Sequence, residues 1–513
     1  MKGLLRSSLV LALVMLALAG CSGKKESAGS VSSEYADTLR VCLEGEPSTL
    51  FPHESAPDPN ITVERQIFNL LLYRTNDMRQ EFIGEIAESW EQINDLTMRF
   101  HLRDDVYFSN GEKCTAEDVK FSLELGNTNS HVHYVNQLER VDVIDPLTVD
   151  VVTKQPNPVL LYHISMVRGG SIMPKKYYES VGGMDGFARA PIGTGPYVLE
   201  SWKSGQSITL KARTDYKQLG DATPGATPTI IFTFNTDMSS RTLEIETGNT
   251  DVILIPDTRD LDRLAGLGFK VETSPSYQMT SVALNVQNVP DEKIRQAMAY
   301  AIDYDAVTDV VFGKKYAKVA TGIVPEIMKS GYVENWNVKY DPEKAKQLVK
   351  ESGHPNGITL QALVSNASER VQMAEILQNQ WRQVGINVNV TTGADATIKD
   401  NFYRGTFEVF PDMNQWSHGD VCRPLHFWRY FPAFGIPEPD ATKINELYDL
   451  GYETLDPVER LKVYDQMQQL ILKYWAFFPI CTKAWCYVTS PKVEGFFPTP
   501  MVNPMFMMVK VKK

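Results

Sequence analysis

Hydrophobic and polar residues recur with two different periods along this chain, and the two periods predict a mixed α/β fold. Residues 39–43 form a short apolar run, which is typical of a buried strand. The apolar positions within 61–72 recur at the three- and four-residue spacing of a helix. Alternating patterns follow at 97–102 and on both sides of Pro146, where a hairpin is expected. Strands and helices therefore share the first part of the chain.

Helix signals become frequent beyond residue 276. Asp341 and Pro342 open one helix, because aspartate caps a helix and proline is tolerated in its first turn. Gly385 is expected to end another. The pattern predicts helices at 291–302, 341–353, 368–384, 441–452 and 457–474, and strands at 230–234, 250–254, 283–286 and 387–390.

A rigid turn precedes a second hairpin in the middle of the chain. Proline fixes φ and glycine permits backbone angles that other residues avoid, so Pro191-Ile-Gly-Thr-Gly-Pro196 is expected to hold one shape. Residues 197–202 then alternate, and residues 208–212 alternate again after a turn. The sequence predicts two paired strands that begin on a fixed turn.

This turn resembles the P-x-G-T-G-P-Y/F crossover of the family 5 extracellular solute-binding proteins, the peptide and nickel receptors of ABC importers. Further segments similar to that family are Ala87-Glu-Ser-Trp90, Phe100-His-Leu-Arg103, Phe108-Ser-Asn-Gly111, Thr115-Ala-Glu-Asp-Val119 and Ile294-Arg-Gln-Ala-Met-Ala-Tyr-Ala-Ile-Asp303. The likeness extends from about Leu39 to Val511. It implies an α/β fold of the periplasmic-binding-protein type II kind, with two lobes, a hinge and an extra inserted subdomain.

The length of 513 residues is too large for one hydrophobic core, so several subdomains are expected. Together with the resemblance, the pattern divides the chain into a lipoprotein signal peptide (1–20), a flexible tether (21–38), lobe I (39–70), the inserted subdomain (71–188), lobe I again (189–275), lobe II (276–486) and a return to lobe I (487–513).

The N-terminus has the features of an export signal. Lys2 and Arg6 precede an apolar run at 9–18, which is too short to span a bilayer as a permanent helix. The segment Leu18-Ala-Gly-Cys21 resembles a lipobox, which implies that Cys21 is lipidated. Residues 22–38 offer little to bury and suit a flexible tether. We expect an exported protein, lipid-anchored at the outer face of the cytoplasmic membrane or in the periplasm.

Charge and hydropathy restrict the partners. The chain carries 51 basic and 63 acidic residues, a net charge of -12. This acidity argues against nucleic acid or an anionic membrane surface as a partner. No segment after the signal peptide has the roughly 18 consecutive apolar residues of a transmembrane helix. Any membrane channel must therefore be another protein. The family resemblance implies ABC permease subunits with their ATPases as partners, and we expect the protein to be a monomer.

Five cysteines follow the lipidated one, so at least one of them is unpaired. Cys481 and Cys486 would lie about 16 Å apart along a strand, beyond the reach of a disulfide. If a disulfide forms, the preferred pairing joins Cys422 to Cys481 or Cys486. Cys42 and Cys114 complete the set.

Local signatures of enzymes are missing. The chain has no Gly-x-Ser-x-Gly elbow, zinc helix, phosphate loop or Cys-x-x-Cys pair, so neither catalysis nor a cofactor is expected. Histidines raise the question of a metal, since His131 and His133 would share one strand face, and His418 and His426 flank the candidate pocket. For His131 and His133, the alternative that they are solvent-exposed loop residues is favoured.

The predicted ligand-contacting segment is Trp416 to Phe427, which resembles the family's W-x-x-D-x-x-D-P-x-x-F. The resemblance places Asp420 where peptide receptors bind the α-ammonium group of the peptide. Arg423 and His426 depart from the family pattern. Arg423 could neutralise Asp420, or it could receive a ligand carboxylate. Trp416 could stack on the ligand or fill the core.

Two further positions complete the predicted site. Arg370 lies near a carboxylate-binding arginine of dipeptide receptors, with a surface salt bridge as the alternative. Asn285 could bond ligand backbone or be an ordinary strand residue. The favoured function is a receptor that captures a di- or oligopeptide between its lobes. A nickel or other metal chelate, another charged solute and, from a different class, a secreted hydrolase or a sensor lipoprotein are the alternatives.

Overall fold

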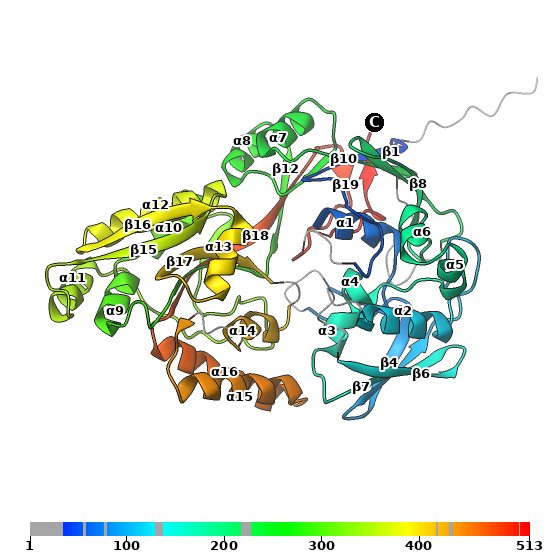
Figure 1. Ribbon diagram of the computed structural model, residues 1–513. Helices are drawn as coiled ribbons and strands as arrows, with labels where there is room; N and C mark the ends of the chain where they lie inside the picture. The colour runs from blue at the N-terminus through cyan, green and yellow to red at the C-terminus, as the bar shows by residue number, and fades with distance from the viewer. Residues whose placement is uncertain are drawn as a thin grey trace, which may run out of the picture.

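The computed structural model describes residues 34–54, 58–75, 80–128, 137–216, 227–416, 419–429, 434–501 and 503–513. Figure 1 shows lobe II on one side, in green to orange, and the inserted subdomain with the N-terminal part of lobe I on the other, in blue and cyan; the later segments of lobe I are green and red. Long strands cross between the two sides. The predicted mixture of strands and helices is confirmed.

Lobe I is built from segments far apart in the sequence. Its elements are β1 (Thr38–Leu43), α1 (Asp58–Ile67), β8 (Tyr197–Lys203), β9 (Ser207–Ala212), β10 (Thr229–Phe234), α7 (Met238–Glu246), β11 (Val252–Leu254), α8 (Leu261–Gly266), β12 (Lys270–Pro275), β19 (Val493–Glu494) and β20 (Lys510–Val511).

The segment between α1 and β8 carries the inserted subdomain. Its elements are β2 (Leu72–Arg74), β3 (Phe82–Gly84), β4 (Ala87–Asn94), β5 (Thr97–Leu102), α2 (Ala116–Thr128), β6 (Leu138–Asp145), β7 (Thr148–Thr153), α3 (Leu160–Ile164), α4 (Val167–Gly170), α5 (Lys175–Ser180) and α6 (Met184–Arg189).

Lobe II contains the remaining elements. They are β13 (Gln278–Leu284), α9 (Glu292–Tyr300), α10 (Tyr304–Phe312), β14 (Ala317–Val319), α11 (Pro342–Glu351), β15 (Ile358–Ser365), α12 (Ser368–Arg382), β16 (Ile386–Gly393), α13 (Asp395–Tyr403), β17 (Val409–Gln415), α14 (Cys422–Arg429), α15 (Asp440–Glu453), α16 (Pro457–Lys473) and β18 (Phe477–Thr489).

Strand β18 joins the two lobes. Its first half pairs with β13 and β14, and its second half pairs with β12 and β11, all antiparallel. The chain leaves lobe I at the end of β12 and enters lobe II at β13, so this passage lies beside β18. Two adjacent strand passages therefore connect the lobes (Figure 1). The mixed sheet continues outward to β16 on one side and β8 on the other.

The central turn owes its shape to a close approach of backbones. A Cβ added at Gly193 or Gly195 would lie 2.1 or 2.5 Å from the carbonyl oxygen of Ile67, at the end of α1. The amide of Gly195 donates a hydrogen bond to that oxygen over 2.8 Å. Neither glycine has a positive φ. The predicted turn and hairpin are confirmed, but glycine is needed here for space and not for a left-handed backbone.

The inserted subdomain has its own sheet and its own buried cluster. Its strands follow the order β4-β5-β7-β6, and α2 packs against β6. The start of α2 is capped, since the Asp118 carboxylate accepts hydrogen bonds from the amide and hydroxyl of Thr115. Phe100, Val119 and Val149 are fully buried in this cluster. The sheet and helix thus form a separate body beside lobe I.

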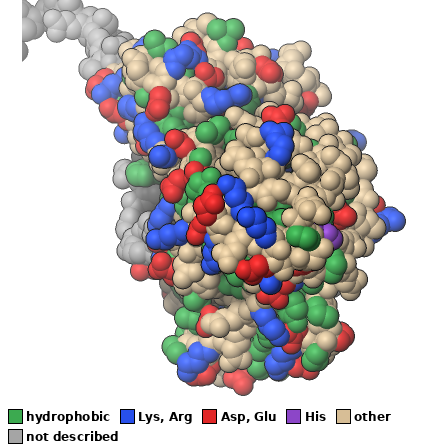
Figure 2. Space-filling view, turned by 90° about the vertical axis from the view of Figure 1, so that its left-hand side faces the viewer, with side chains coloured by type: hydrophobic (Ala, Val, Ile, Leu, Met, Phe, Trp, Pro, Cys, Tyr) green, Lys and Arg blue, Asp and Glu red, His purple; other side chains and the backbone are tan. Residues whose placement is uncertain are grey.

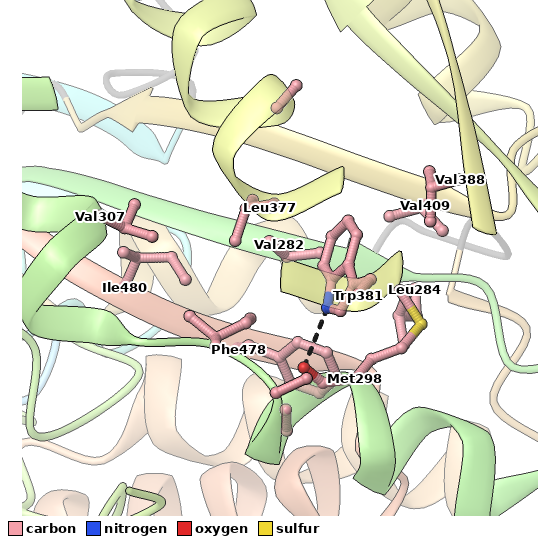
Figure 3. Packing of buried hydrophobic residues seen from close by; sticks show 14 of the residues in the cluster. Val282, Leu284, Met298, Val307, Leu377, Trp381, Val388, Val409, Phe478 and Ile480 are labelled. Carbon is pink, nitrogen blue, oxygen red and sulfur yellow. Dashed lines mark hydrogen bonds between the residues drawn. The ribbon is translucent and has the colours of Figure 1, made fainter. Parts of the chain in front are cut away.

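Helix α12 covers the sheet of lobe II, as Figure 3 shows. Trp381 is 1% exposed and its indole nitrogen donates a hydrogen bond to the carbonyl of Met298 over 3.0 Å. The partner carbonyl satisfies the polar edge of the ring, so the rest of the ring can fill the core. Gly385, at φ 90°, follows this helix as predicted.

The cysteines in the described residues are all free thiols and are buried. The predicted pairing of Cys422 with Cys481 or Cys486 is therefore wrong. Cys422 lies in a cluster with Trp428 of lobe II, Cys481 packs beneath the lobe II sheet, and Cys486 belongs to a small cluster at the lobe I end of β18. Burial in separate clusters keeps these sulfurs apart.

The face of lobe II shown in Figure 2 mixes basic and acidic side chains without a broad apolar area.

Among the helices in the described ranges, none has the length and apolar character needed to cross a membrane. The predicted signal peptide, the lipidated Cys21, His131, His133 and His418 lie outside the described residues.

Candidate functional site

A cleft opens where lobe I, the inserted subdomain and the start of lobe II meet. The space between its walls amounts to about 650 Å³ when the open solvent at its mouth is included. Its walls come from α1, the end of β2, the turn between α3 and α4, the strand crossing and the C-terminal return. The lining residues are Ile61, Arg65, Leu70, Tyr73, Arg74, Thr75, Ser165, Met166, Val167, Arg168, Tyr277, Thr499, Pro500, Met501, Asn503 and Met505.

This lining contains three arginines and no aspartate, glutamate or lysine. Arg65, on α1, has a partner: its guanidinium lies 2.5 Å from the carboxylate of Glu85 and donates to the carbonyl of Phe68. Glu85 also accepts a hydrogen bond from the amide of Leu70. The charge of Arg65 is therefore neutralised inside the protein.

Arg74 has no carboxylate partner among the residues that the structure describes. Its Nη1 atom is buried and has no hydrogen-bond partner within the described residues. The guanidinium instead lies 5.2 Å from the ring centre of Tyr162 and 5.3 Å from that of Tyr277. Aromatic faces stabilise a cation but leave its N–H donors unused. Among the described residues, Arg74 therefore has no counter-ion, and its buried Nη1 donor is unused beside the cleft that this residue lines.

Arg168, the second residue of α4, lies near a carboxyl group whose ionisation is disfavoured by burial. Burial raises the pKa of Glu64 to about 8, and the nearby Arg168 charge only partly opposes the effect. Glu64 is 1% exposed and its Oε1 has no hydrogen-bond partner in the described part of the chain. Near neutral pH this carboxyl is mostly protonated, so it does not cancel the positive charge on the cleft.

The two sides of the cleft touch each other around these residues. Tyr277, at the strand crossing, donates a hydrogen bond from its hydroxyl to the side-chain oxygen of Gln80. A Cβ added at Gly419 would lie 3.0 Å from Nη1 of Arg74 and 2.9 Å from the Tyr277 hydroxyl. Residue 419 therefore brings the predicted ligand segment of lobe II directly against Arg74.

Asp420 follows immediately and is completely buried. Its two carboxylate oxygens each accept a hydrogen bond of 2.7 Å from Arg460, which α16 supplies. The Cys422 amide donates a third bond, over 2.8 Å. Burial alone would lower the pKa of Arg460, but the charge and the hydrogen bonds of Asp420 together outweigh burial, and the pKa is raised. The predicted ammonium-binding carboxylate already has a cation of the protein beside it.

The neighbours of Asp420 have structural contacts. Trp416 is 8% exposed and packs edge-on against Phe427, in the buried cluster of lobe II. His426, on α14, shares a 3.1 Å hydrogen bond with the hydroxyl of Tyr448. Arg423 is half-buried in the first turn of the same helix. These residues pack together, with Trp416 among core residues, and their roles in ligand binding stay predictions.

Arg370 and Asn285 lie elsewhere in lobe II. Arg370 bridges two strands and a helix, with Asp412 at 2.8 Å and Asp395 at 3.0 Å. Asn285 accepts hydrogen bonds from the amides of Gln287 and Asn288, which organises the turn after β13. Neither residue lines the cleft described above. Their roles in ligand binding remain predictions.

The sequence did not single out Arg65, Arg74, Arg168, Tyr162 or Tyr277. Arg74 ends an apolar run, Leu70-Leu-Leu-Tyr-Arg74, and nothing in that run marks it as a ligand residue. A cation at the end of a buried strand is a weak signal by itself. The cleft arises because segments more than 400 residues apart meet there, as Arg65 and Met505 do.

A metal site is not evident from the described residues, since they contain no group of three or more His, Cys, Asp or Glu placed to hold an ion. His426 faces Tyr448, which is not a typical ligand for a soft or borderline metal. The cleft itself offers guanidinium, aromatic, thioether and amide groups. Such a lining can bind an anionic or amphipathic solute.

Comparison with known proteins identifies the family. A sequence profile for bacterial extracellular solute-binding proteins, family 5 Middle, matches residues 81–431. The glutathione-binding protein GsiB of Salmonella paratyphi A is 27% identical over 474 residues, covering 88% of this chain and 90% of its own.

Solved structures show the same fold. NikA from Brucella suis in complex with Fe(III)-EDTA is 22% identical, with a TM-score of 0.82 over 93% of this chain and 100% of its own. DppA from Helicobacter pylori in complex with the peptide STSA is 20% identical, with a TM-score of 0.73 over 93% and 99% of the two chains. The chain belongs to the family 5 extracellular solute-binding proteins of ABC importers and has their periplasmic-binding-protein type II fold.

Proposed function

We propose that this protein captures a small peptide between its lobes and delivers it to the permease of an ABC importer. The observation that carries the proposal is the cleft at the junction of both lobes and the inserted subdomain, lined by apolar side chains and arginines. A ligand held there would contact bodies that are connected by strand passages. Rotation about those passages would couple capture to closure.

The similar proteins support a peptide as the solute. DppA from Helicobacter pylori is described with a bound peptide, and GsiB is a glutathione-binding protein. A peptide supplies a carboxylate for an arginine, apolar side chains for the methionines at 166, 501 and 505, and backbone groups for Asn503. In this proposal the solute is bound and released without chemical change.

The most direct test identifies what the protein carries. Native mass spectrometry of the purified protein, followed by calorimetry with the released compound, should show one peptide bound per chain with saturable binding. A panel of chromogenic peptides and esters tests the hydrolase alternative in the same preparation. Hydrolysis of any of these substrates would contradict the receptor assignment and support an enzyme.

We also propose that Cys21 carries a lipid that holds the mature protein at the membrane. The lipobox-like Leu18-Ala-Gly-Cys21 and the tether at 22–38 support this anchor. Replacement of Cys21 by alanine should release the protein from the membrane fraction and leave ligand affinity unchanged. A membrane-bound variant would contradict the anchor.

A metal chelate is the second candidate, because the arginines of the cleft would suit an anionic chelate as well as a carboxylate. NikA from Brucella suis is described with Fe(III)-EDTA. A chelate of this kind brings its own metal ligands and needs none from the protein. Calorimetry with Fe(III)-EDTA and with metal-free EDTA separates this candidate from the peptide.

A further inference from the structure

Arg460, which is buried, and Arg74, which is half-buried, both lie beside residues 419–420, and within the described residues only Arg460 has a carboxylate partner. Arg460 is 4% exposed and holds both oxygens of Asp420. Arg74 contacts the rings of Tyr162 and Tyr277, and its Nη1 donor is unused within the described residues. A buried guanidinium donor that meets no acceptor is costly, and a ligand oxyanion would remove that cost.

We propose that Arg74 is the ligand-anion receptor of the cleft, and that the transported solute is therefore net anionic, with a carboxylate seated on Arg74 between Tyr162 and Tyr277. This inference rests on the proposed function and names the class of solute. The carboxylate accepts hydrogen bonds from the guanidinium, while the tyrosine rings hold the guanidinium plane in place.

The remaining lining agrees with this class of solute. Arg168 adds a second positive charge, and the described residues that line the cleft include no aspartate or glutamate. Met166, Met501 and Met505 offer flexible apolar contacts, which suit an apolar body of variable shape. The solute is thus a small amphipathic anion with a carboxylate at one end, and an acidic peptide fits this description.

The same geometry assigns Asp420 a different role from the one its place in the family pattern suggests. An ammonium group could use Asp420 only by displacing Arg460 from two hydrogen bonds of 2.7 Å. Such a displacement would leave a buried guanidinium without its counter-ion, which is strongly unfavourable. Asp420 therefore holds the segment at residue 419 against Arg74 and is not the primary contact for a ligand ammonium group.

The test uses one peptide backbone in three charge forms: N-acetylated with a free carboxylate, unmodified, and C-terminally amidated with a free ammonium. Calorimetry with the full mature protein should give similar affinities for the first two forms and a loss of at least tenfold for the amide. Fe(III)-EDTA and glutarate serve as anions that are not peptides. Equal binding of the amide, or loss of binding on acetylation, would overturn the inference.

Variants locate the effect. Arg74→Gln should weaken the best anionic probe by about 10- to 100-fold, and Arg74→Lys, which keeps the charge but not the planar fork, by less. Arg140→Gln is the matched control, because Arg140 is exposed and pairs with Asp142 on the inserted subdomain. Circular dichroism and melting curves confirm that each variant is folded. Unchanged affinity in folded Arg74→Gln would overturn the inference.

The outcomes also separate this inference from the proposed function. If the three forms of the peptide bind with equal affinity, the result supports the peptide receptor and overturns the anion site. Binding of Fe(III)-EDTA or glutarate alone, with a loss in Arg74→Gln, supports the anion site and overturns the peptide. Absence of binding by every anionic probe overturns the anion site.

Discussion

Arg460 and Arg74 lie close to the same short segment, yet their surroundings differ in one respect. The guanidinium of Arg460 forms an ion pair with the Asp420 carboxylate, and both side chains are buried inside lobe II. Arg74 has two aromatic rings and an open cleft. The charge and the residue type are the same in both places. The presence of a counter-ion therefore distinguishes an arginine that stabilises the protein from one that is available to a solute.

Removal of one member of the sealed pair should have the largest effect. Asp420→Asn leaves the Arg460 guanidinium buried without a counter-ion, so lobe II should lose about 3–5 kcal/mol of unfolding free energy. Urea denaturation of the ligand-free protein measures this loss. The double variant Asp420→Asn, Arg460→Met should recover part of it.

Asp449→Asn is a suitable control for that experiment, because Asp449 forms an exposed pair with Arg429 on the same lobe. Its unfolding free energy should lie within about 1 kcal/mol of the parent protein. An Asp420→Asn protein as stable as this control would show that the pair does not support the lobe.

Arg65 provides the same contrast inside the cleft. Arg65→Gln leaves Glu85 buried without its cation, although the Leu70 amide still donates to it. The loss of unfolding free energy should be about 2–3 kcal/mol, smaller than for Asp420→Asn because one donor remains. Both Arg65 and Arg74 line the cleft. Comparing the stability loss of Arg65→Gln with that of Arg74→Gln therefore tests whether a counter-ion decides how much an arginine contributes to stability.

The buried carboxyl beside Arg168 should make stability depend on pH. Burial raises the pKa of Glu64 to about 8, so the folded protein favours the protonated form. The unfolded chain ionises this group above about pH 4.3, and the stability contribution is therefore full below that pH and is lost as the pH rises toward 8. Glu64→Gln, which cannot ionise, should gain on the order of 2 kcal/mol of unfolding free energy relative to the parent protein between pH 5.5 and pH 7.

Thermal melts of both proteins across that range give the difference directly. The comparison of variant with parent cancels other titrating groups, among them His53, whose pKa burial lowers to about 4, and Glu44, whose pKa burial raises to about 7. A difference in melting temperature that does not change with pH would show that Glu64 is ionised in the folded protein.

Arg74→Gln should have the smallest effect on stability. No ion pair is broken, and only two cation–π contacts are lost, so the unfolding free energy of the ligand-free protein should change by about 1 kcal/mol or less. The rise in melting temperature on addition of an anionic ligand should nevertheless disappear. A large loss of stability without ligand would make Arg74 a structural residue like Arg460.

The sequence predicted the elements of the fold well. The apolar run at 39–43 forms β1, the pattern at 97–102 forms β5, and the alternating segments after the central turn form β8 and β9. Asp341 and Pro342 do begin a helix, and the Asp341 carboxylate accepts the Lys344 amide. Caps, turns and periodicity depend on residues a few positions apart, so they can be predicted from the sequence.

The partners of individual charges were not readable in this way. Asp420 was recognisable from its place in a family-like segment, but the residue that holds it lies 40 positions later, on another helix. Arg74 carried no recognisable signal, and the cysteine pairing was wrong because the sulfurs lie in separate buried clusters. Each of these outcomes depends on distances between segments that only the packed lobes define.

By itself, then, the sequence determined the α/β elements, the turn that returns the chain to lobe I and the family to which the chain belongs. The tertiary structure alone decided which buried charges are satisfied within the protein and which remain for a solute. The physical reason is that hydrogen bonds within helices and turns are local, whereas the neutralisation of a buried ion depends on which distant residue folding brings within about 3 Å of it.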